Sequence, residues 1–180
     1  QMEKDLIKSY YASVSYMDAM LGKLISALDD LGMRNNTTIV FWSDHGFFLG
    51  EHGFWCKHHT FQEAIHVPLI VSSPGMKKNV KSDALVEYVD IYPTISEIAG
   101  LTPPEYIHGK SFVPILNNPK LDFKDEIYSR YQFREVVQDK EYSYHEILYY
   151  PETEKNKYGA KTHIPGTKIV VTQKMLFDMK

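Results

Sequence analysis

Cysteine is almost absent from this sequence of 180 residues. Its single cysteine, Cys56, has no partner for a disulfide within the chain, so the fold must depend on a packed core. Long apolar runs are missing as well, and no stretch approaches the roughly 20 consecutive apolar residues of a membrane span. The sequence also lacks the glycine-rich loop of dinucleotide-binding proteins and the P-loop, so no cofactor-binding glycine motif is present.

An excess of positive charge is missing too. The formal net charge is -3, so the chain shows no basic footprint for a nucleic acid partner. Hydrophobic residues make up 43% and charged residues 24% of the chain, which is typical of an ordinary globular protein. The chain opens at Gln1 with neither an initiator methionine nor a targeting segment, so we expect the natural N-terminus to lie upstream.

Two segments carry the spacing of amphipathic helices. From Leu6 to Leu31 apolar residues recur at three- and four-residue steps, which predicts one helix face, and Gly32 is expected to end that helix. Residues 84–98 repeat the pattern, and Asp90 is the predicted N-cap, because Pro93 fits only in the first turn of a helix. These two helices are the most regular elements that the sequence predicts.

Continuous apolar runs over 37–42 and 66–72 predict two strands that are buried on both faces. The order of helix, strand, loop, strand and helix is typical of an α/β fold, in which helices flank a mostly parallel central sheet. Alternating segments at 126–131, 142–150 and 168–172 predict a smaller antiparallel sheet after it.

The strand over 37–42 is followed by a carboxylate and an imidazole, Asp44 and His45. Ligands of α/β proteins bind beyond the carboxyl ends of strands, and Gly46 would let the backbone turn so that both side chains meet one ion. Both groups bind divalent metals, although imidazole favours zinc, manganese or iron over calcium. We therefore predict a metal site here, with a polar turn as the alternative.

A loop rich in glycine leads from this strand to Lys57, which lies beside His58 and His59. An ammonium in this setting would pair with an anionic group of a substrate, and a solvated loop lysine is the alternative. The histidines of the loop are, one by one, more often structural than catalytic. Cys56 has no assigned base or oxyanion hole, so we do not predict it to be a nucleophile.

Several motifs together resemble one family in order and spacing. They are Ser43-Asp44-His45-Gly46, Leu49-Gly50-Glu51-His52-Gly53, Lys57, His66-Val67-Pro68-Leu69-Ile70 and Val89-Asp90-Ile91-Tyr92-Pro93-Thr94. This series resembles the C-terminal half of the catalytic domain of the sulfatase family, in the alkaline phosphatase superfamily, and above all its iduronate-2-sulfatase-like members. The resemblance covers residues 4–116. It implies an alkaline-phosphatase-like layered fold over 1–120 and a smaller, incomplete α+β subdomain over 121–180.

The resemblance implies a sulfuric ester hydrolase that removes sulfate from a saccharide and binds Ca²⁺, with Mn²⁺ or Zn²⁺ as alternatives because of the imidazole. In this chain Asp44 and His45 would be metal ligands, Lys57 would bind the sulfate, and Lys57 and His45 would act in catalysis. We also assign His59 to substrate binding. Members of the family are secreted, periplasmic or lysosomal, so the resemblance implies one of these locations.

The family's nucleophile is a formylglycine made from a Cys/Ser-x-Pro-x-Arg motif, and this sequence has no such motif. We therefore expect an N-terminal half, with the formylglycine, to be the partner of this chain, which would be inactive alone. Residues 135–172 match no pattern of the family. Two alternatives remain open: a phosphoester or phosphonate hydrolase of the same superfamily, or a saccharide-binding remnant without catalysis.

Overall fold

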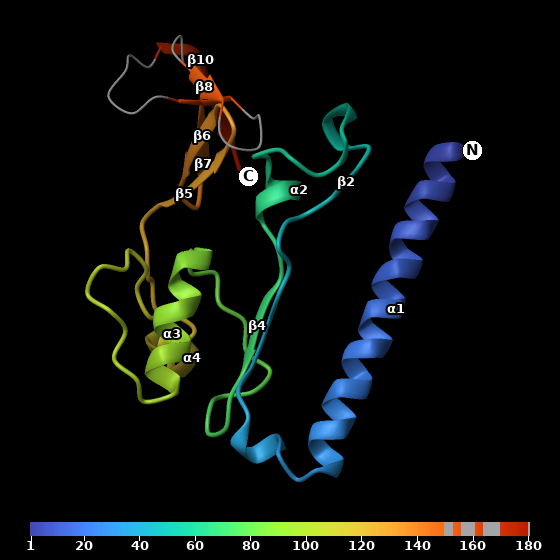
Figure 1. Ribbon diagram of the computed structural model, residues 1–180, viewed down its shortest axis with the longest axis vertical. Coiled ribbons are helices and arrows are strands. Elements are labelled where there is room, and N and C mark those ends of the chain that lie inside the picture. Colours follow the sequence, from blue (N-terminus) through green and yellow to red (C-terminus); the bar gives the residue numbers. More distant parts are fainter. Residues whose placement is uncertain (150–152, 156–160, 164–169, 180) are drawn as a thin grey trace. The chain divides into compact units, whose positions relative to one another are not determined.

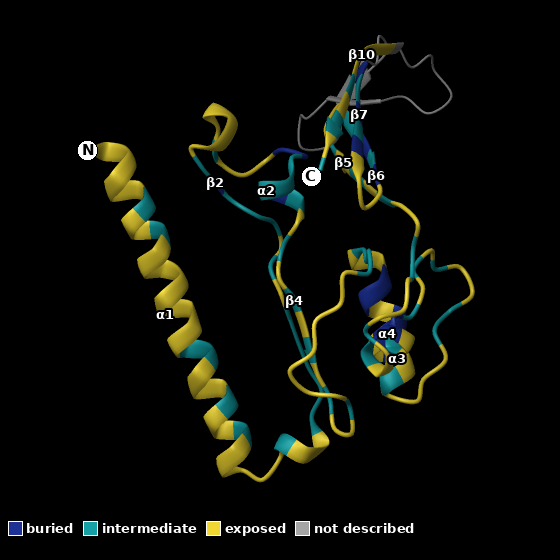
Figure 2. Cartoon of the chain, turned by 180° about the vertical axis from the view of Figure 1, so that it is seen from behind, coloured by how far each residue is buried: buried dark blue, intermediate teal, exposed yellow. Residues whose placement is uncertain are grey.

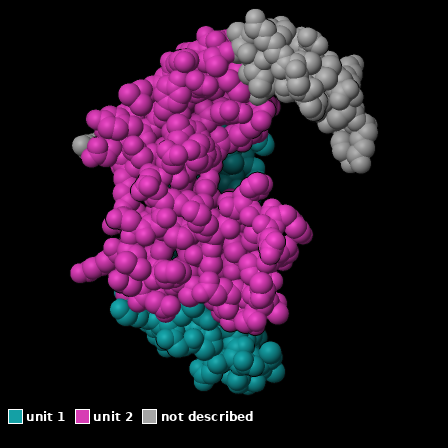
Figure 3. All heavy atoms as spheres, turned by 90° about the vertical axis from the view of Figure 1, so that its left-hand side faces the viewer, with its two compact units in different colours: residues 1–79 teal, residues 80–180 magenta. Residues whose placement is uncertain are grey.

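The computed structural model describes residues 1–149, 153–155, 161–163 and 170–179. The chain divides between Asn79 and Val80 into two compact units, which are coloured separately in Figure 3. The domain boundary at residue 120 that the family resemblance implies stays a prediction.

Unit 1 begins with a long helix, α1 (Met2–Asp30), which confirms the first predicted helix and extends it by one turn (Figure 1). Gly32 has a φ of 65°, the left-handed conformation that commonly follows a helix end. None of the 29 residues of α1 is buried, and Figure 2 shows the helix largely in the colour of exposed residues. Within the described part of the chain, no helix is long and apolar enough to cross a membrane.

The two predicted strands of unit 1 form an antiparallel pair. β1 (Ile39–Trp42) and β4 (Leu69–Ser72) pair with Ile39 opposite Ser72 and Trp42 opposite Leu69. The sequence predicts a mostly parallel sheet, so the direction of this pair differs from that prediction. The connection between them contains one helix of four residues, α2 (Gln62–Ile65), whereas parallel neighbours are usually joined through a full crossover helix.

The connection between β1 and β4 contains a second, very short hairpin. β2 (Phe48–Leu49) and β3 (Trp55–Cys56) pair antiparallel, and the 3₁₀ turn η2 (Glu51–Gly53) joins them. A further 3₁₀ turn, η1 (Arg34–Asn36), leads from α1 to β1. The ring of Tyr10 on α1 stacks on Phe47 with centroids 4.8 Å apart, which ties the helix to the start of this hairpin.

Unit 2 begins with the 3₁₀ turn η3 (Tyr88–Asp90) and α3 (Ile91–Ile98), and α4 (Val113–Asn117) follows. α3 begins directly after Asp90, the N-cap that the sequence predicts, and the part of the amphipathic pattern before Tyr88 lies outside the helix. A capping box explains the start, because the Asp90 carboxylate accepts the backbone N–H of Glu87 at 2.8 Å. Ile91, Phe112 and Ile115 are buried, and Figure 2 shows buried segments in this part of the unit.

A buried ion cluster holds the start of α3. Lys124 donates to Glu87 at 2.5 Å and to Asp90 at 2.7 Å, and the Asp90 side chain is fully buried. Asp90 also accepts the backbone N–H of Lys110 at 2.9 Å, and Glu87 accepts that of Tyr128 at 2.9 Å. The cluster thus joins α3 to the chain before α4 and to the first strand of the sheet.

The tail of unit 2 confirms the predicted antiparallel sheet. Its four strands lie in the order β10-β7-β6-β5, and every pairing is antiparallel. A separate pair follows β7. The bounds are β5 (Ile127–Tyr131), β6 (Arg134–Gln138), β7 (Tyr142–Tyr149), β8 (Thr153–Lys155), β9 (Lys161–His163) and β10 (Val170–Asp178). Residues 168–169 of the last predicted strand lie outside the described residues.

Candidate active site

The chain bends sharply where β1 ends. Ser43 Oγ donates to the backbone carbonyl of His45 at 2.8 Å, which closes a tight turn around Asp44. The carboxylate of Asp44 is 80% exposed, so a ligand from solvent can reach it. The structure thus places Asp44 and His45 at a strand end, as the sequence predicts.

Gly46 fixes this turn against α2. Its N–H donates to the carbonyl of Ala64 at 2.7 Å. A Cβ atom at position 46 would lie 1.8 Å from the carbonyl oxygen of Glu63, so only glycine permits this close approach. The direction of the two preceding side chains therefore depends on a contact with a helix that comes later in the chain.

The β2–β3 hairpin brings the chain back to the end of β1. Phe48 pairs with Cys56, so Lys57 falls opposite Phe47 and close to the end of β1. Lys57 Nζ donates to Asp44 Oδ2 at 3.0 Å. The structure thus brings two predicted site residues into direct contact, 13 positions apart in the chain.

The backbone on both sides of Lys57 is unusual. Cys56 has a φ of 69° and His58 a φ of 81°, the left-handed region that non-glycine residues seldom adopt. Each such residue costs about 1–2 kcal/mol, so the surrounding contacts must hold the loop in this form. Backbone strain of this kind often gathers at functional sites.

Asp44 and Lys57 form an ion pair. The hydrogen bond from Lys57 and the charge of its ammonium hold the pKa of the Asp44 carboxyl below its ordinary value of 3.8. The contact with Lys57 therefore favours the ionised form of Asp44, which is the form that binds a metal. The Lys57 side chain is 39% exposed, so it can also reach an anion from solvent.

His45 is oriented by its own neighbour. Its Nδ1 lies 3.0 Å from the carbonyl oxygen of Gly46 and must donate to it, because a carbonyl only accepts. The other ring nitrogen, Nε2, then carries the lone pair that a metal would use. Metal-bound histidines commonly donate their second nitrogen to a carbonyl in this way, so the donor set fits a metal ion.

Asp44 and His45 offer two metal ligands, which is fewer than any common divalent ion requires. Over the described residues 1–149, 153–155, 161–163 and 170–179, no group of three or more His, Cys, Asp or Glu side chains is arranged so that it could hold a metal ion. The pair therefore fits part of a metal site, with further ligands to come from water, substrate or residues outside this sequence.

His59 lies away from solvent, with 7% of its surface exposed. It stacks on Phe61 with ring centroids 4.2 Å apart, on Phe54 at 4.6 Å, and meets the edge of Phe48 at 6.0 Å. This cluster of rings packs the loop that carries Lys57. The assignment of His59 to substrate binding stays a prediction, and the packing gives the residue a structural part in the loop.

Two further side chains lock the turn between β2 and β3. Glu51 accepts the backbone N–H of Leu49 at 2.6 Å, and this bond lowers the pKa of Glu51 below its ordinary value. His52 Nε2 lies 3.1 Å from Glu63 Oε1 on α2, so the turn and the helix are linked. The sequence alone does not reveal this link, since no pattern relates the two positions.

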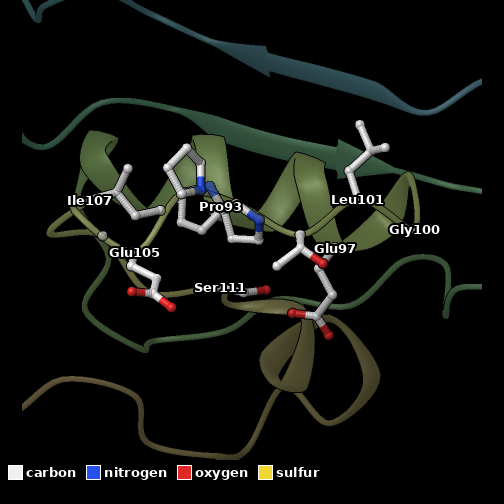
Figure 4. A pocket seen from close by; sticks show the side chains of 11 residues that line it. Pro93, Glu97, Gly100, Leu101, Glu105, Ile107 and Ser111 are labelled. Carbon is white, nitrogen blue, oxygen red and sulfur yellow. The ribbon is translucent and has the colours of Figure 1, made fainter.

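Unit 2 has a hollow of about 570 Å³ beside α3, shown in Figure 4. Its wall is mostly apolar, with Pro93 and Leu101 among the lining residues, and the side chains of Glu97 and Glu105 lie on either side of Ser111. None of the site residues predicted from the sequence lines it.

The family of the chain follows from its first hundred residues. Residues 1–101 match the family model described as Sulfatase. The chain belongs to the sulfatase family. This finding confirms the resemblance, and sulfatases are generally metal-dependent.

Curated relatives support the same family. Human iduronate 2-sulfatase is 36% identical over 163 residues, which cover 76% of this chain and 29% of that protein. Mouse arylsulfatase K is 38% identical over 115 residues, 64% of this sulfatase chain and 21% of the relative. A sulfatase of Formosa agariphila is 41% identical over 113 residues, which cover 63% of this chain and 22% of that protein. The chain thus spans less than a third of the length of these relatives.

Solved structures show the fold. A protein bound to its substrate D-glucosamine-2-N,6-O-disulfate matches with a TM-score of 0.75 and 27% identity, over 92% of this chain and 32% of that one. The phosphonate monoester hydrolase of Silicibacter pomeroyi matches in fold, with a TM-score of 0.71 and 24% identity. The match covers 90% of this chain and 32% of that one. The chain has the alkaline-phosphatase-like fold of these sulfatase neighbours, as predicted.

Proposed function

We propose that this chain supplies half of the metal and sulfate site of an enzyme that removes sulfate from a saccharide. The contact that carries the proposal is the 3.0 Å ion pair of Lys57 with Asp44, exposed at the end of β1. A sulfate ester presents anionic oxygens, which a metal ion and an ammonium side by side would bind together. The sulfated glucosamine in a structural neighbour and the iduronate 2-sulfatase relatives support a sulfated saccharide as substrate.

In this proposal the side chains have separate tasks. Asp44, through a carboxylate oxygen, and His45, through Nε2, would hold the metal, which supplies a Lewis acid for the sulfuryl oxygens. Calcium is the first candidate, and manganese or zinc are the alternatives that the imidazole favours. Lys57 would donate to a sulfate oxygen and offset the negative charge that grows there in the transition state. This is the sense in which Lys57 and His45 are catalytic.

The proposal also requires a nucleophile that this chain does not contain. A formylglycine in the N-terminal half of the full-length protein would supply it, and that half would be the partner of this chain. The chain alone would then show no turnover. We further propose a location outside the cytosol, as the resemblance to secreted, periplasmic and lysosomal sulfatases implies.

Phosphoester or phosphonate hydrolysis is one alternative to sulfate ester hydrolysis, because the phosphonate monoester hydrolase has the same fold. A saccharide-binding remnant without catalysis is the other. Turnover of sulfated against phosphorylated saccharides by the full-length protein separates all three functions. Faster hydrolysis of the phosphate or phosphonate ester, or binding with no hydrolysis, would contradict the proposal.

Lys57→Ala in the full-length protein tests the site. We expect kcat/KM for a sulfated saccharide to fall about a hundred-fold or more, because one preorganised charge at the transition state is lost. The free energy of unfolding should change by less than about 1 kcal/mol, since the ion pair is exposed. Lys77→Ala, at an exposed lysine of unit 1, is the control and should keep full activity. Unchanged kinetics in Lys57→Ala would refute the role of Lys57.

Asp44→Ala tests the metal site. We expect the bound metal, measured by elemental mass spectrometry on the purified full-length protein, to fall below stoichiometric occupancy, because a charged ligand is gone. A metal content equal to that of the unchanged protein would show that Asp44 is not a ligand.

A further inference from the structure

The Asp44 carboxylate has two partners in the proposed site. Asp44 Oδ2 accepts the hydrogen bond of Lys57 at 3.0 Å, and the same carboxylate is the proposed ligand of the metal. We propose that Lys57 changes partner when the metal binds: it neutralises Asp44 beforehand and is released toward the sulfate afterwards. This inference rests on the proposed function and adds an order to it, in which metal binding prepares the sulfate site.

Electrostatics favours the exchange. An ammonium held 3.0 Å from a carboxylate oxygen would lie within a few ångströms of a divalent ion bound to that carboxylate. Two cations at such a distance repel each other, so the Lys57 ammonium leaves or weakens its bond as the metal arrives. The Lys57 side chain is 39% exposed and that of Asp44 80%, so solvent reaches the ion pair and keeps it weak enough to be broken.

The backbone allows the side chain to move while its base stays in place. Cys56 is paired with Phe48, and His59 is packed among phenylalanine rings, so the residues on both sides of Lys57 are held. A lysine has a flexible four-carbon stem that carries its charge at the end. Lys57 therefore can turn from Asp44 to a sulfate oxygen without leaving the site.

Coupling of this kind is reciprocal. If the metal makes Lys57 available to sulfate, then sulfate, by drawing Lys57 from Asp44, must raise the affinity for the metal by the same factor. Before the metal arrives, Lys57 competes with it for Asp44. Removal of the ammonium should therefore tighten metal binding, although it damages the binding of sulfate.

The first experiment measures calcium binding to the chelator-treated full-length protein by isothermal titration calorimetry. In the absence of sulfate we expect Lys57→Met to bind Ca²⁺ about two- to five-fold more tightly than the unchanged protein, the range that an exposed ion pair supplies. Lys57→Arg keeps the charge and should keep the original affinity. Equal or weaker Ca²⁺ binding by Lys57→Met would overturn the partner exchange.

The second experiment follows the ammonium directly. The full-length protein is treated briefly with acetic anhydride with and without Ca²⁺, and acetylation of each lysine is measured by mass spectrometry. We expect Ca²⁺ to speed the labelling of Lys57, and Asp44→Asn to speed it without Ca²⁺. Lys77 follows Ser72, which pairs with Ile39 at the opposite end of β1 from Asp44, so it serves as the unchanged control. An acetylation rate of Lys57 that is the same with and without Ca²⁺ would overturn the proposal.

The outcomes separate this inference from the function itself. If Lys57→Ala abolishes turnover of the sulfate ester while Lys57→Met leaves Ca²⁺ affinity unchanged, the partner exchange fails and the function stands. If the unchanged full-length protein binds none of Ca²⁺, Mn²⁺ and Zn²⁺, both fail.

Discussion

Gly46 lies against α2 so closely that a methyl group would overlap the carbonyl oxygen of Glu63 at 1.8 Å. The two residues before it carry the proposed metal ligands. A side chain at position 46 would thus push the end of β1 away from the helix and move both ligands. The precise placement of the site depends on a residue that has no side chain.

Gly46→Ala is therefore expected to destabilise the full-length protein by about 1–3 kcal/mol, the usual cost of overpacking, and to lower metal content as well. Gly22→Ala is the matched control. Gly22 lies within α1, where nothing approaches its missing side chain within 4 Å. That substitution should stabilise the protein by up to about 1 kcal/mol, because alanine is the better helix former. Chemical denaturation of both variants measures the difference, and equal shifts would contradict the packing argument.

At the scale of residues, the sequence predicted the positions of Asp44 and His45 because a continuous apolar run ends directly before them. The sequence singled out Lys57 only by its position in a glycine-containing loop beside two histidines. The contact of Lys57 with Asp44 could not be predicted, since it follows from the register of two-residue strands that carry no periodic pattern. The burial of His59 could not be predicted for the same reason, because the short hairpin brings Phe48 and Phe54 to its ring.

Among the elements, the ion cluster of Glu87, Asp90 and Lys124 decides where α3 begins. Burial lowers the pKa of Lys124, but its hydrogen bonds to Asp90 and Glu87 outweigh that cost, and the net pKa is raised above 10.5. A raised pKa means that the ammonium contributes stability at every pH below about 10.5. The contribution is lost only in alkali, as the pH rises through the folded-state pKa.

Lys124→Met removes the cation and leaves two carboxylates, one of them fully buried, without it. We expect unit 2 to lose about 3 kcal/mol of stability, because a buried charge without its partner is costly. Lys120→Met, at an exposed lysine four positions earlier, should change stability by less than about 0.5 kcal/mol. Urea unfolding of the two variants measures both values, and a small effect of Lys124→Met would show that the backbone N–H groups satisfy the carboxylates alone.

The sheet of unit 2 carries a second buried titratable group. His145 on β7 is 2% exposed and its Nε2 lies 2.8 Å from Ser143 Oγ. Burial, and then the charge of Arg134, lower the pKa of His145 below its ordinary value of 6.5. The unfolded chain therefore binds the proton more tightly, so the stability from neutral His145 is complete above pH 6.5 and is lost as the pH falls toward the lower, folded-state pKa.

His145→Gln should flatten this dependence, because glutamine keeps a polar group near Ser143 but does not titrate. Native-state hydrogen exchange of β6 and β7, corrected for the intrinsic exchange rates, should show opening free energies that fall less between pH 7 and pH 5 than in the unchanged protein. His108→Gln, at an exposed position, is the control and should keep the original slope. An identical slope in His145→Gln would remove His145 as the source of the pH dependence.

Which elements the sequence predicts depends on length and regularity. α1 has eight turns of one pattern and was predicted almost to its ends. β6 was missed, because its residues, Arg134–Gln138, mix charge with valine and show no alternation. The antiparallel direction of β1 and β4 was not predicted either, since the periodicity of a strand carries no information about its partner.

At the scale of the whole molecule, α1 presents an apolar stripe that the described residues cover only in part. It comprises Ile7, Tyr10, Val14, Met17, Leu21, Ile25 and Leu28. Met17 is 42% exposed, and no residue of the helix is buried. Because the chain spans 29% of its human relative, we expect the rest of the full-length protein to cover this stripe.

Met17→Lys is then expected to destabilise the full-length protein by about 2 kcal/mol, because it places a charge in an apolar contact. Ala19→Lys, at an exposed position on the opposite side of α1, is the matched control and should stay within about 0.5 kcal/mol. Thermal unfolding of the two variants measures the difference. Equal stabilities would mean that the stripe faces solvent in the full-length protein as well.

The short β2–β3 hairpin also bears on the order in which the protein acquires its structure during synthesis. Asp44 and Lys57 are only 13 residues apart, so little chain entropy is lost when they meet. Contacts so close in sequence form early in folding, before pairings that must wait for distant segments. This cationic and anionic pair would therefore be assembled on the ribosome while the sheet of unit 2 is still being translated.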